Sequence, residues 1–202
     1  PALLSDSMLQ NLAEFVDQPA KGGSLVLIAG PRHLPEGYRE TVLAPLMPIE
    51  LQGVRPIQPG EAGSEPFTIR PTQLGLRDPG MQLGDKLSET RRIWGKLPPV
   101  YWHVEVPEVK PGARVLAEHP DRRGPDGRPL PLFVMHYVGA GKVLFAATDS
   151  TWRWRRGPGD VLYQRFWGQV CWCPATEEEG VDTMRLDQPA ELLFDGTKIV
   201  ID

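Results

Sequence analysis

A short apolar run between two pairs of turn residues constrains this chain more than any other feature. Residues 24–29 read SLVLIA, with Gly-Gly directly before the run and Gly-Pro directly after it. A continuous run of branched apolar residues of this length is typical of a strand that is covered on both faces of a parallel sheet. Asp6 is the expected N-cap of a preceding helix, because Leu9, Leu12 and Val16 follow it at helical spacing. The opening of the chain therefore predicts an α/β fold.

Hydrophobic periodicity and turn residues predict the remaining elements. The expected helices cover 38–46, 88–96 and 160–173, and the expected strands cover 67–70, 100–104, 113–117, 132–138 and 142–147. The last two strands form a hairpin, because only Gly139, Ala140 and Gly141 separate them. Residues 119–131 are rich in Pro, Asp, Arg and Gly, so we expect an exposed loop there. Asp195-Gly196 between two apolar stretches predicts a short second hairpin near the C-terminus.

Composition excludes several classes of protein. The 202 residues are 41% hydrophobic and 24% charged, which suits a packed core. The net charge of −4 argues against nucleic-acid binding through a broad basic surface. No apolar run is long enough to cross a bilayer, so we expect no membrane insertion by this segment. Two cysteines are too few for a disulfide scaffold or a four-thiolate zinc site, and we expect no metal and no cofactor.

Both ends of the chain read as parts of larger units. The chain starts with Pro1, almost at the first helical pattern, and stops at Asp202 directly after a strand-like run. We therefore interpret it as a piece of a larger polypeptide, whose other domains are the expected partners. The acidic run Glu177–Glu179 reads as a solvated linker. The predicted division is one domain over 1–174, followed by a linker and the start of a β-rich segment over 175–202.

A set of ordered motifs is similar to one known family. In chain order the motifs are Ile28-Ala29-Gly30, Trp94-Gly95-Lys96-Leu97-Pro98-Pro99, Gly139-Ala140-Gly141-Lys142-Val143-Leu144-Phe145, Thr148-Asp149-Ser150-Thr151-Trp152-Arg153-Trp154-Arg155 and Tyr163-Gln164-Arg165-Phe166-Trp167-Gly168-Gln169. Over residues 5–174 the chain resembles the class I glutamine amidotransferase-like domain. The version it resembles occurs in large membrane-anchored bacterial proteins of the planctomycete type, often beside a von Willebrand factor type A-like domain.

This resemblance carries expectations about fold and location. It implies a flavodoxin-like three-layer α/β sandwich with a mostly parallel sheet, here lacking its first strands. The extracytoplasmic part of a membrane-anchored bacterial protein is then one candidate location, which the sequence itself leaves unknown.

The residues that the family uses for amide hydrolysis are missing from their expected places. In active members a Cys on a strand-to-helix elbow is activated by a His that follows a later strand. The matching stretches here are Gly30-Pro31-Arg32-His33 and Thr148-Asp149-Ser150-Thr151, which supply neither group in its family position. The resemblance therefore implies a non-catalytic binding or scaffolding module. The alternative is a glutamine amidotransferase or other hydrolase with a rebuilt site, for which His33, Asp149 and Ser150 are the candidates.

Five residues are candidates for ligand binding: Arg32, His33, Trp152, Arg153 and Trp154. The first two follow a strand, and open α/β folds bind ligands beyond the carboxyl ends of their strands. The other three combine aromatic faces with a guanidinium group, which suits a carbohydrate, a carboxylate or a peptide. Alternatively, the two tryptophans pack between the last strand and the last helix, and the arginines pair with nearby carboxylates. Both interpretations stay open. The alternative function, a domain that binds a small molecule, a glycan or a peptide, therefore also stays open.

The sequence also contains isolated cysteines and histidines that we expect to be structural. Cys171 and Cys173 are two positions apart on a predicted helix, where their side chains diverge, so we expect packing rather than a shared metal or a disulfide. His103 and His136 lie in strand-like runs and are expected as core or surface groups with satisfied hydrogen bonds.

Overall fold

The computed structural model describes residues 4–18, 22–33, 35–57, 65–156 and 160–172, together with the backbone of residues 191–194 and 197–200. The α-helices are α1 (Asp6–Val16), α2 (Leu87–Trp94) and α3 (Asp160–Trp172). The 3-10 helices are η1 (Glu36–Tyr38), η2 (Ala44–Leu46), η3 (Gly75–Arg77), η4 (Pro79–Met81) and η5 (Ser150–Arg155). The strands are β1 (Ser24–Ile28), β2 (Arg55–Pro56), β3 (Arg70–Pro71), β4 (Val104–Glu105), β5 (Arg114–Arg123), β6 (Pro129–Val138), β7 (Gly141–Ala146), β8 (Glu191–Phe194) and β9 (Thr197–Val200).

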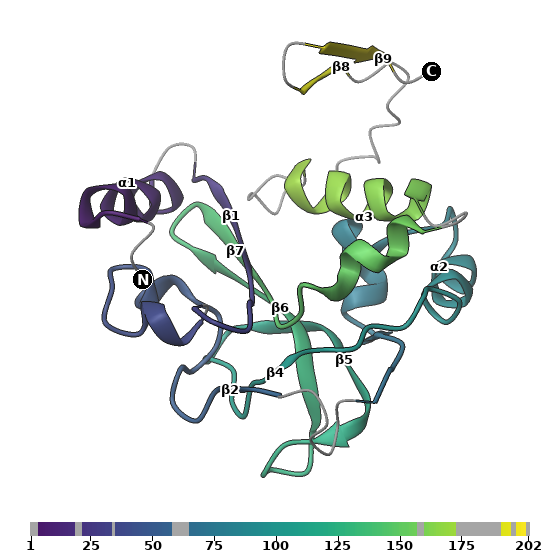
Figure 1. Ribbon diagram of the computed structural model, residues 1–202, viewed down its shortest axis with the longest axis horizontal. Helices are drawn as coiled ribbons and strands as arrows, with labels where there is room; N and C mark the ends of the chain where they lie inside the picture. Colours follow the sequence, from purple (N-terminus) through teal and green to yellow (C-terminus); the bar gives the residue numbers. More distant parts are fainter. Residues whose placement is uncertain are drawn as a thin grey trace.

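Five strands form one mixed sheet in the order β1-β7-β6-β5-β3 (Figure 1). β1 and β7 pair in parallel, whereas the pairs β7-β6, β6-β5 and β5-β3 are antiparallel. The mixed α/β class is confirmed, but the expectation of a mostly parallel sheet is wrong for the described strands. The reason is that short turns join β5 to β6 and β6 to β7, and a short turn can connect only antiparallel neighbours.

β1 lies at one edge of the described sheet and not in its interior. Ile28 is 42% exposed, so the expectation that both faces of this strand are covered is wrong at its end. Gly23 and Ala29 both hydrogen-bond to β7 or to its flank. Because the pattern repeats every second residue, the N–H and C=O groups of Ser24, Val26 and Ile28 point away from β7.

The expected glycine-rich turns bring two connections into close contact. A Cβ added to Gly22, between α1 and β1, would collide with the backbone of Ala140 in the β6-β7 turn. A Cβ added to Gly141 would collide with the backbone of Val16 at the end of α1. Glycine is therefore required at both positions to pack the end of α1 against this hairpin.

Several local expectations are corrected by the structure. The N-cap of α1 is Ser5, whose Oγ accepts a hydrogen bond from the Met8 N–H at 3.3 Å, and not Asp6. The expected helix at 38–46 is replaced by the short helices η1 and η2. The expected loop at 119–131 is mostly strand, because β5 and β6 extend into it and leave a turn over 124–128. The expected C-terminal hairpin is confirmed, since β8 and β9 pair antiparallel.

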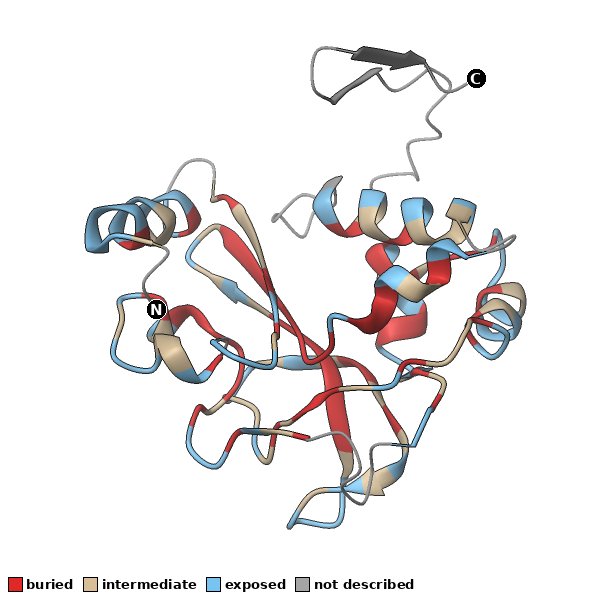
Figure 2. Cartoon of the chain, in the orientation of Figure 1, coloured by how far each residue is buried: buried red, intermediate tan, exposed pale blue. Residues whose placement is uncertain are grey.

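A cluster of four buried rings joins the sheet to the helices. The rings of Trp94, Phe133, Trp154 and Phe166, hereafter the Trp94 cluster, have neighbouring centroids 5.4–6.4 Å apart. They come from α2, β6, η5 and α3, so four elements meet at this point. Figure 2 shows buried residues running along β6 and β7 and under α3.

Candidate ligand-binding surface

The predicted site residues follow two strands that end at the same edge of the sheet. Because β1 and β7 are parallel neighbours, the segments after Ile28 and after Ala146 both leave the sheet at its carboxyl-end side. Arg32 and His33, after β1, are exposed. Three residues after β7 the chain enters η5, which carries Ser150, Trp152, Arg153 and Trp154, and Asp149 is the N-cap residue of this helix. The topology therefore supports a site at this edge, as the sequence predicts.

The hydroxyl of Ser150 serves the local turn. Ser150 is buried, and its Oγ lies 3.4 Å from Oδ1 of Asp149. The Ser150 N–H donates to Oγ1 of Thr148, and that hydroxyl donates to the carbonyl oxygen of Trp102. Among the described residues, no hydrogen bond joins His33 to Ser150 or Asp149. The structure thus does not assemble these three residues into an acid–base–nucleophile set.

The two tryptophans of η5 have opposite environments. Trp154 is 1% exposed, and its Nε1 donates to the carbonyl oxygen of Pro98 at 3.0 Å. Its ring belongs to the Trp94 cluster. Trp152 is 44% exposed. The packing interpretation is therefore correct for Trp154, whose ring is closed to solvent, whereas the exposed ring of Trp152 is available to a ligand.

Arg153 lies between the exposed Trp152 and a tyrosine from a distant part of the chain. Its guanidinium carbon lies 4.4 Å from the ring centroid of Tyr101 and 4.7 Å from that of Trp152, within cation–π distance of both. Arg156 approaches the Trp152 ring at 5.4 Å. Tyr101 is 45% exposed. We call Tyr101, Trp152, Arg153 and Arg156 the aromatic–arginine surface.

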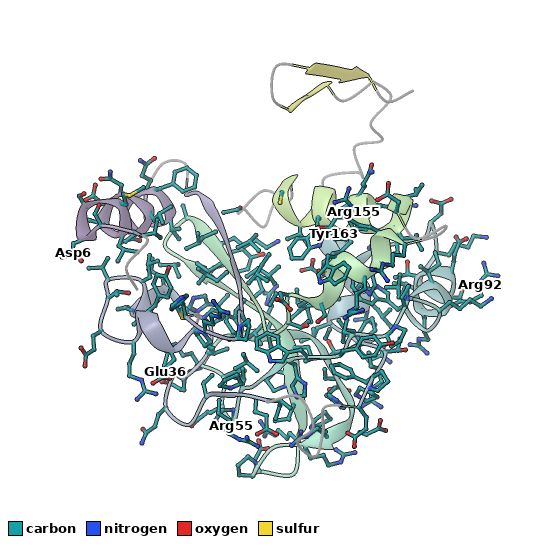
Figure 3. The ribbon with its side chains drawn as sticks, in the orientation of Figure 1. Asp6, Glu36, Arg55, Arg92, Arg155 and Tyr163 are labelled. Atoms are coloured by element: carbon teal, nitrogen blue, oxygen red, sulfur yellow. The ribbon has the colours of Figure 1, made fainter. Side chains whose placement is uncertain are left out.

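The two guanidinium groups of this surface have no anionic partner among the described residues. Nε of Arg153 is buried without a hydrogen-bond partner, and no described carboxylate lies within ion-pair distance of Arg153 or Arg156. The expectation that the arginines pair with nearby carboxylates is met for Arg155 alone. Arg155 lies 3.5 Å from Asp160 and stacks over Tyr163 of α3 (Figure 3).

A second aromatic cluster holds two buried histidines. The ring centroids of Phe67 and His119 are 4.0 Å apart, and those of His103 and His119 are 5.1 Å apart. These three residues are hereafter the His103 cluster. His103 is fully buried and His119 is 5% exposed, which corrects the expectation of an exposed loop at His119. Both ring nitrogens of His103 and Nε2 of His119 have no hydrogen-bond partner, which corrects the expectation that His103 is satisfied.

Burial controls the protonation of this pair. Burial above all, together with the electrostatic effect of His119, Arg122 and Arg55, lowers the pKa of His103 to about 3. Burial likewise lowers the pKa of His119 to about 4, against the carboxylate of Asp121, which raises it. Nδ1 of His119 accepts from the N–H groups of Asp121 and Arg122, so its proton sits on Nε2. Both rings are neutral near pH 7.

A shallow hollow of about 470 Å³ lies away from the predicted site residues. Lys110 lines it, and the Lys110 Nζ donates to the carbonyl oxygens of Ala44 and Pro45 at 2.9 and 3.0 Å. Glu50 and Arg39 also line it, and Arg39 donates to the carbonyl oxygen of Leu51. Its two cationic side chains, Lys110 and Arg39, thus hydrogen-bond to backbone carbonyls of the loop around η2.

Other site types can be judged from the described residues. Cys171 is a free and exposed thiol, contrary to the expected packing, and Cys173 lies outside the described residues. The described part of the chain contains no cluster of three or more His, Cys, Asp or Glu side chains suited to a metal. None of its helices combines the length and the apolarity needed to span a bilayer.

Comparisons with known proteins place the chain by its fold alone. No family model and no curated protein matches it. Two solved cytoplasmic proteins of Salmonella typhimurium are similar in structure. The one from strain LT2 has a TM-score of 0.52 at 24% identity, over 81% of this chain and 58% of its own. The other has a TM-score of 0.57 at 18% identity, over 84% of this chain and 61% of its own. This chain therefore spans about three fifths of the length of each.

Proposed function

We propose that this chain is a non-catalytic binding module with a class I glutamine amidotransferase-like, flavodoxin-like fold, working inside a larger cell-envelope protein. The ordered motifs from Ile28 to Gln169 support the family, and the shared edge at the ends of β1 and β7 supports the position of the site. The absence of Cys from 30–33 and of His from 148–151 supports the lack of amidase chemistry.

One observation carries the binding function. The guanidinium group of Arg153 stacks on two aromatic rings that are both about half exposed, and no described carboxylate neutralises it. A structural arginine at the surface is usually explained by an ion pair or a carbonyl contact, as Arg155 and Arg39 show here. Aromatic rings with an unpaired cation between them suit recognition of a ligand from solution.

The proposal is tested by a binding screen on the purified chain. We expect a glycan or peptide ligand whose binding is lost in Trp152→Ala, while the circular dichroism spectrum and the melting temperature stay near those of the parent. Arg155→Gln is the matched control, because Arg155 lies in the same helix but pairs with Asp160. Binding that survives Trp152→Ala would place the ligand elsewhere and reject this surface.

The non-catalytic part needs its own assay. We expect no release of ammonia from glutamine by the purified chain. A glutaminase activity that disappears in Cys171→Ser would overturn the proposal, since Cys171 is the exposed thiol of the described residues.

A further inference from the structure

Building on the proposed function, we infer that the aromatic–arginine surface binds an acidic saccharide, with a uronate-type carboxylate held by Arg153 and Arg156 and the sugar ring stacked on Trp152. The inference adds a ligand class to the site, and it rests on the charge state and the openness of these four side chains.

The ligand is expected to carry negative charge because no carboxylate of the described residues compensates the two guanidinium groups of this site. The guanidinium carbons of Arg153 and Arg156 both lie over the ring of Trp152, 4.7 and 5.4 Å from its centroid. Nε of Arg153 is buried without a hydrogen-bond partner, while the Arg153 residue as a whole is partly exposed and Arg156 is exposed. A guanidinium presents its N–H groups as a planar fork that fits both oxygens of a carboxylate. A neutral ligand would leave both charges unpaired.

The ligand must also present a face to an aromatic ring. Trp152 and Tyr101 are each nearly half exposed, and both lie beside Arg153. A pyranose ring has one face of C–H groups and hydroxyls at its rim, so it can stack on an indole while its carboxylate reaches a neighbouring cation. The two requirements are met together by a sugar acid.

A sugar suits this surface better than a peptide does. Peptides are usually held by an exposed strand edge or by a groove. The described hollow lies around η2 and Lys110, away from this surface, and the open strand edge belongs to β1. The aromatic–arginine surface comes from the loop at Tyr101 and from η5 with its flank, and offers side chains instead of a strand edge.

The test compares one acidic oligosaccharide with its neutral counterpart. Isothermal titration of the full chain with oligogalacturonate should show binding that weakens as salt is raised. The fully methyl-esterified oligomer, which has the same rings and no charge, should bind at least about tenfold more weakly. Arg153→Gln should weaken oligogalacturonate binding by about tenfold to a hundredfold, as expected for loss of a hydrogen-bonded charge. Arg156→Gln should act in the same direction by less, and Arg155→Gln should leave binding unchanged.

The outcomes separate this inference from the proposed function. Equal binding of the acidic and esterified oligomers, lost in Trp152→Ala, would overturn the acidic ligand and keep the binding module. Binding of a poly-glutamate peptide but of neither oligosaccharide would replace the sugar with an acidic protein partner and overturn the inference. Tighter binding of a sulfated oligosaccharide than of the uronate would assign the anion as sulfate and overturn the carboxylate. Failure of all these probes would overturn the inference as well, whereas the proposed function would then fail only if the broader screen also found no ligand that depends on Trp152.

Discussion

The core of this protein contains two aromatic clusters that differ in whether their buried polar atoms are hydrogen-bonded. In the Trp94 cluster the polar atoms of both indoles are satisfied, since Nε1 of Trp94 donates to Met81 and Nε1 of Trp154 donates to Pro98. In the His103 cluster three ring nitrogens have no partner. The first cluster therefore stabilises the fold at every pH, whereas the second depends on its histidines staying neutral.

The two clusters also differ in role: the Trp94 cluster connects secondary-structure elements, whereas the His103 cluster contains groups that can be protonated. The Trp94 cluster connects α2, β6, η5 and α3. It therefore holds η5 in place, and η5 carries Trp152 and Arg153 of the aromatic–arginine surface. The His103 cluster lies beside Glu105, which pairs with both Arg55 and Arg122. Protonation of either histidine would add a positive charge next to these arginines, in a place with little water.

The largest effect is expected from breaking the Trp94 cluster. Trp154→Ala should lower the free energy of unfolding by about 3–5 kcal/mol, because it leaves a cavity beside the rings of Trp94 and Phe166 and an unpaired carbonyl at Pro98. Urea denaturation followed by tryptophan fluorescence measures this loss. A loss below about 1 kcal/mol, typical of a surface change, would show that the ring is not part of the core.

The next effect comes from titrating the His103 cluster. Because the folded pKa of His103 is about 3 and the unfolded value is 6.5, the unfolded chain takes up the proton first as the pH falls. The contribution of neutral His103 is fully present above pH 6.5 and is lost progressively between pH 6.5 and about 3. Between pH 7 and pH 4 we expect the titration of His103 alone to lower the free energy of unfolding by on the order of 3 kcal/mol.

Denaturation curves at several pH values check this loss. His103→Leu should flatten the dependence on pH, whereas His33→Gln, at an exposed histidine, should leave it unchanged. A profile for His103→Leu as steep as that of the parent would assign the acid sensitivity to other groups.

A smaller loss of stability is expected when only the indole hydrogen bond of Trp154 is removed. Trp154→Phe keeps an aromatic ring in the Trp94 cluster but leaves the carbonyl of Pro98 without its donor. We expect a loss of about 1–3 kcal/mol, less than for alanine, with little change between pH 7 and pH 5. The same denaturation assay measures it, and a loss as large as that of Trp154→Ala would mean that the shape of the indole matters more than its N–H.

The smallest effect on stability is expected at the surface. Trp152→Ala removes a half-exposed ring and two cation–π contacts, each worth about 0.5–1 kcal/mol at an exposed site. The melting temperature should fall by only a few degrees. A drop comparable to that of Trp154→Ala would show that Trp152 is a structural residue and would remove it from the ligand site.

The sequence predicts most strands but not how they pair. The hairpin of β6 and β7 follows directly from Gly139, Ala140 and Gly141, because few residues separate two apolar runs. The direction of β1 relative to β7, and the place of β1 at an edge, depend on which strands meet in space, which no local pattern encodes. The helix expected at 38–46 fails because Pro45 and the local turns favour short 3-10 segments over an α-helix.

The position of the site beyond the carboxyl ends of β1 and β7 stays a prediction, whereas the different exposure of its two tryptophans could not be predicted from the sequence. Residues two apart share a face in a strand but diverge in a 3-10 helix of three residues per turn, which is why Trp152 and Trp154 separate. Tyr101 was missed, because its contact with Arg153 joins positions fifty residues apart. No local pattern marks Tyr101 as exposed, because burial does not alternate there: His103 and Val104 are both buried. His119 was misplaced because Pro and Gly suggest a loop, whereas irregular register between β5 and β6 accommodates them.

The two edges of the described five-stranded sheet differ in how readily they would accept a further strand. β3 is two residues long, contains Pro71, and carries Arg70 in an ion pair with Glu118, features that discourage a further strand. β1 is longer, uncharged and free of proline, and half of its backbone groups face outward. Among the described strands of this sheet, β1 is therefore the edge beside which a further strand can pair, and β3 is the edge that resists it.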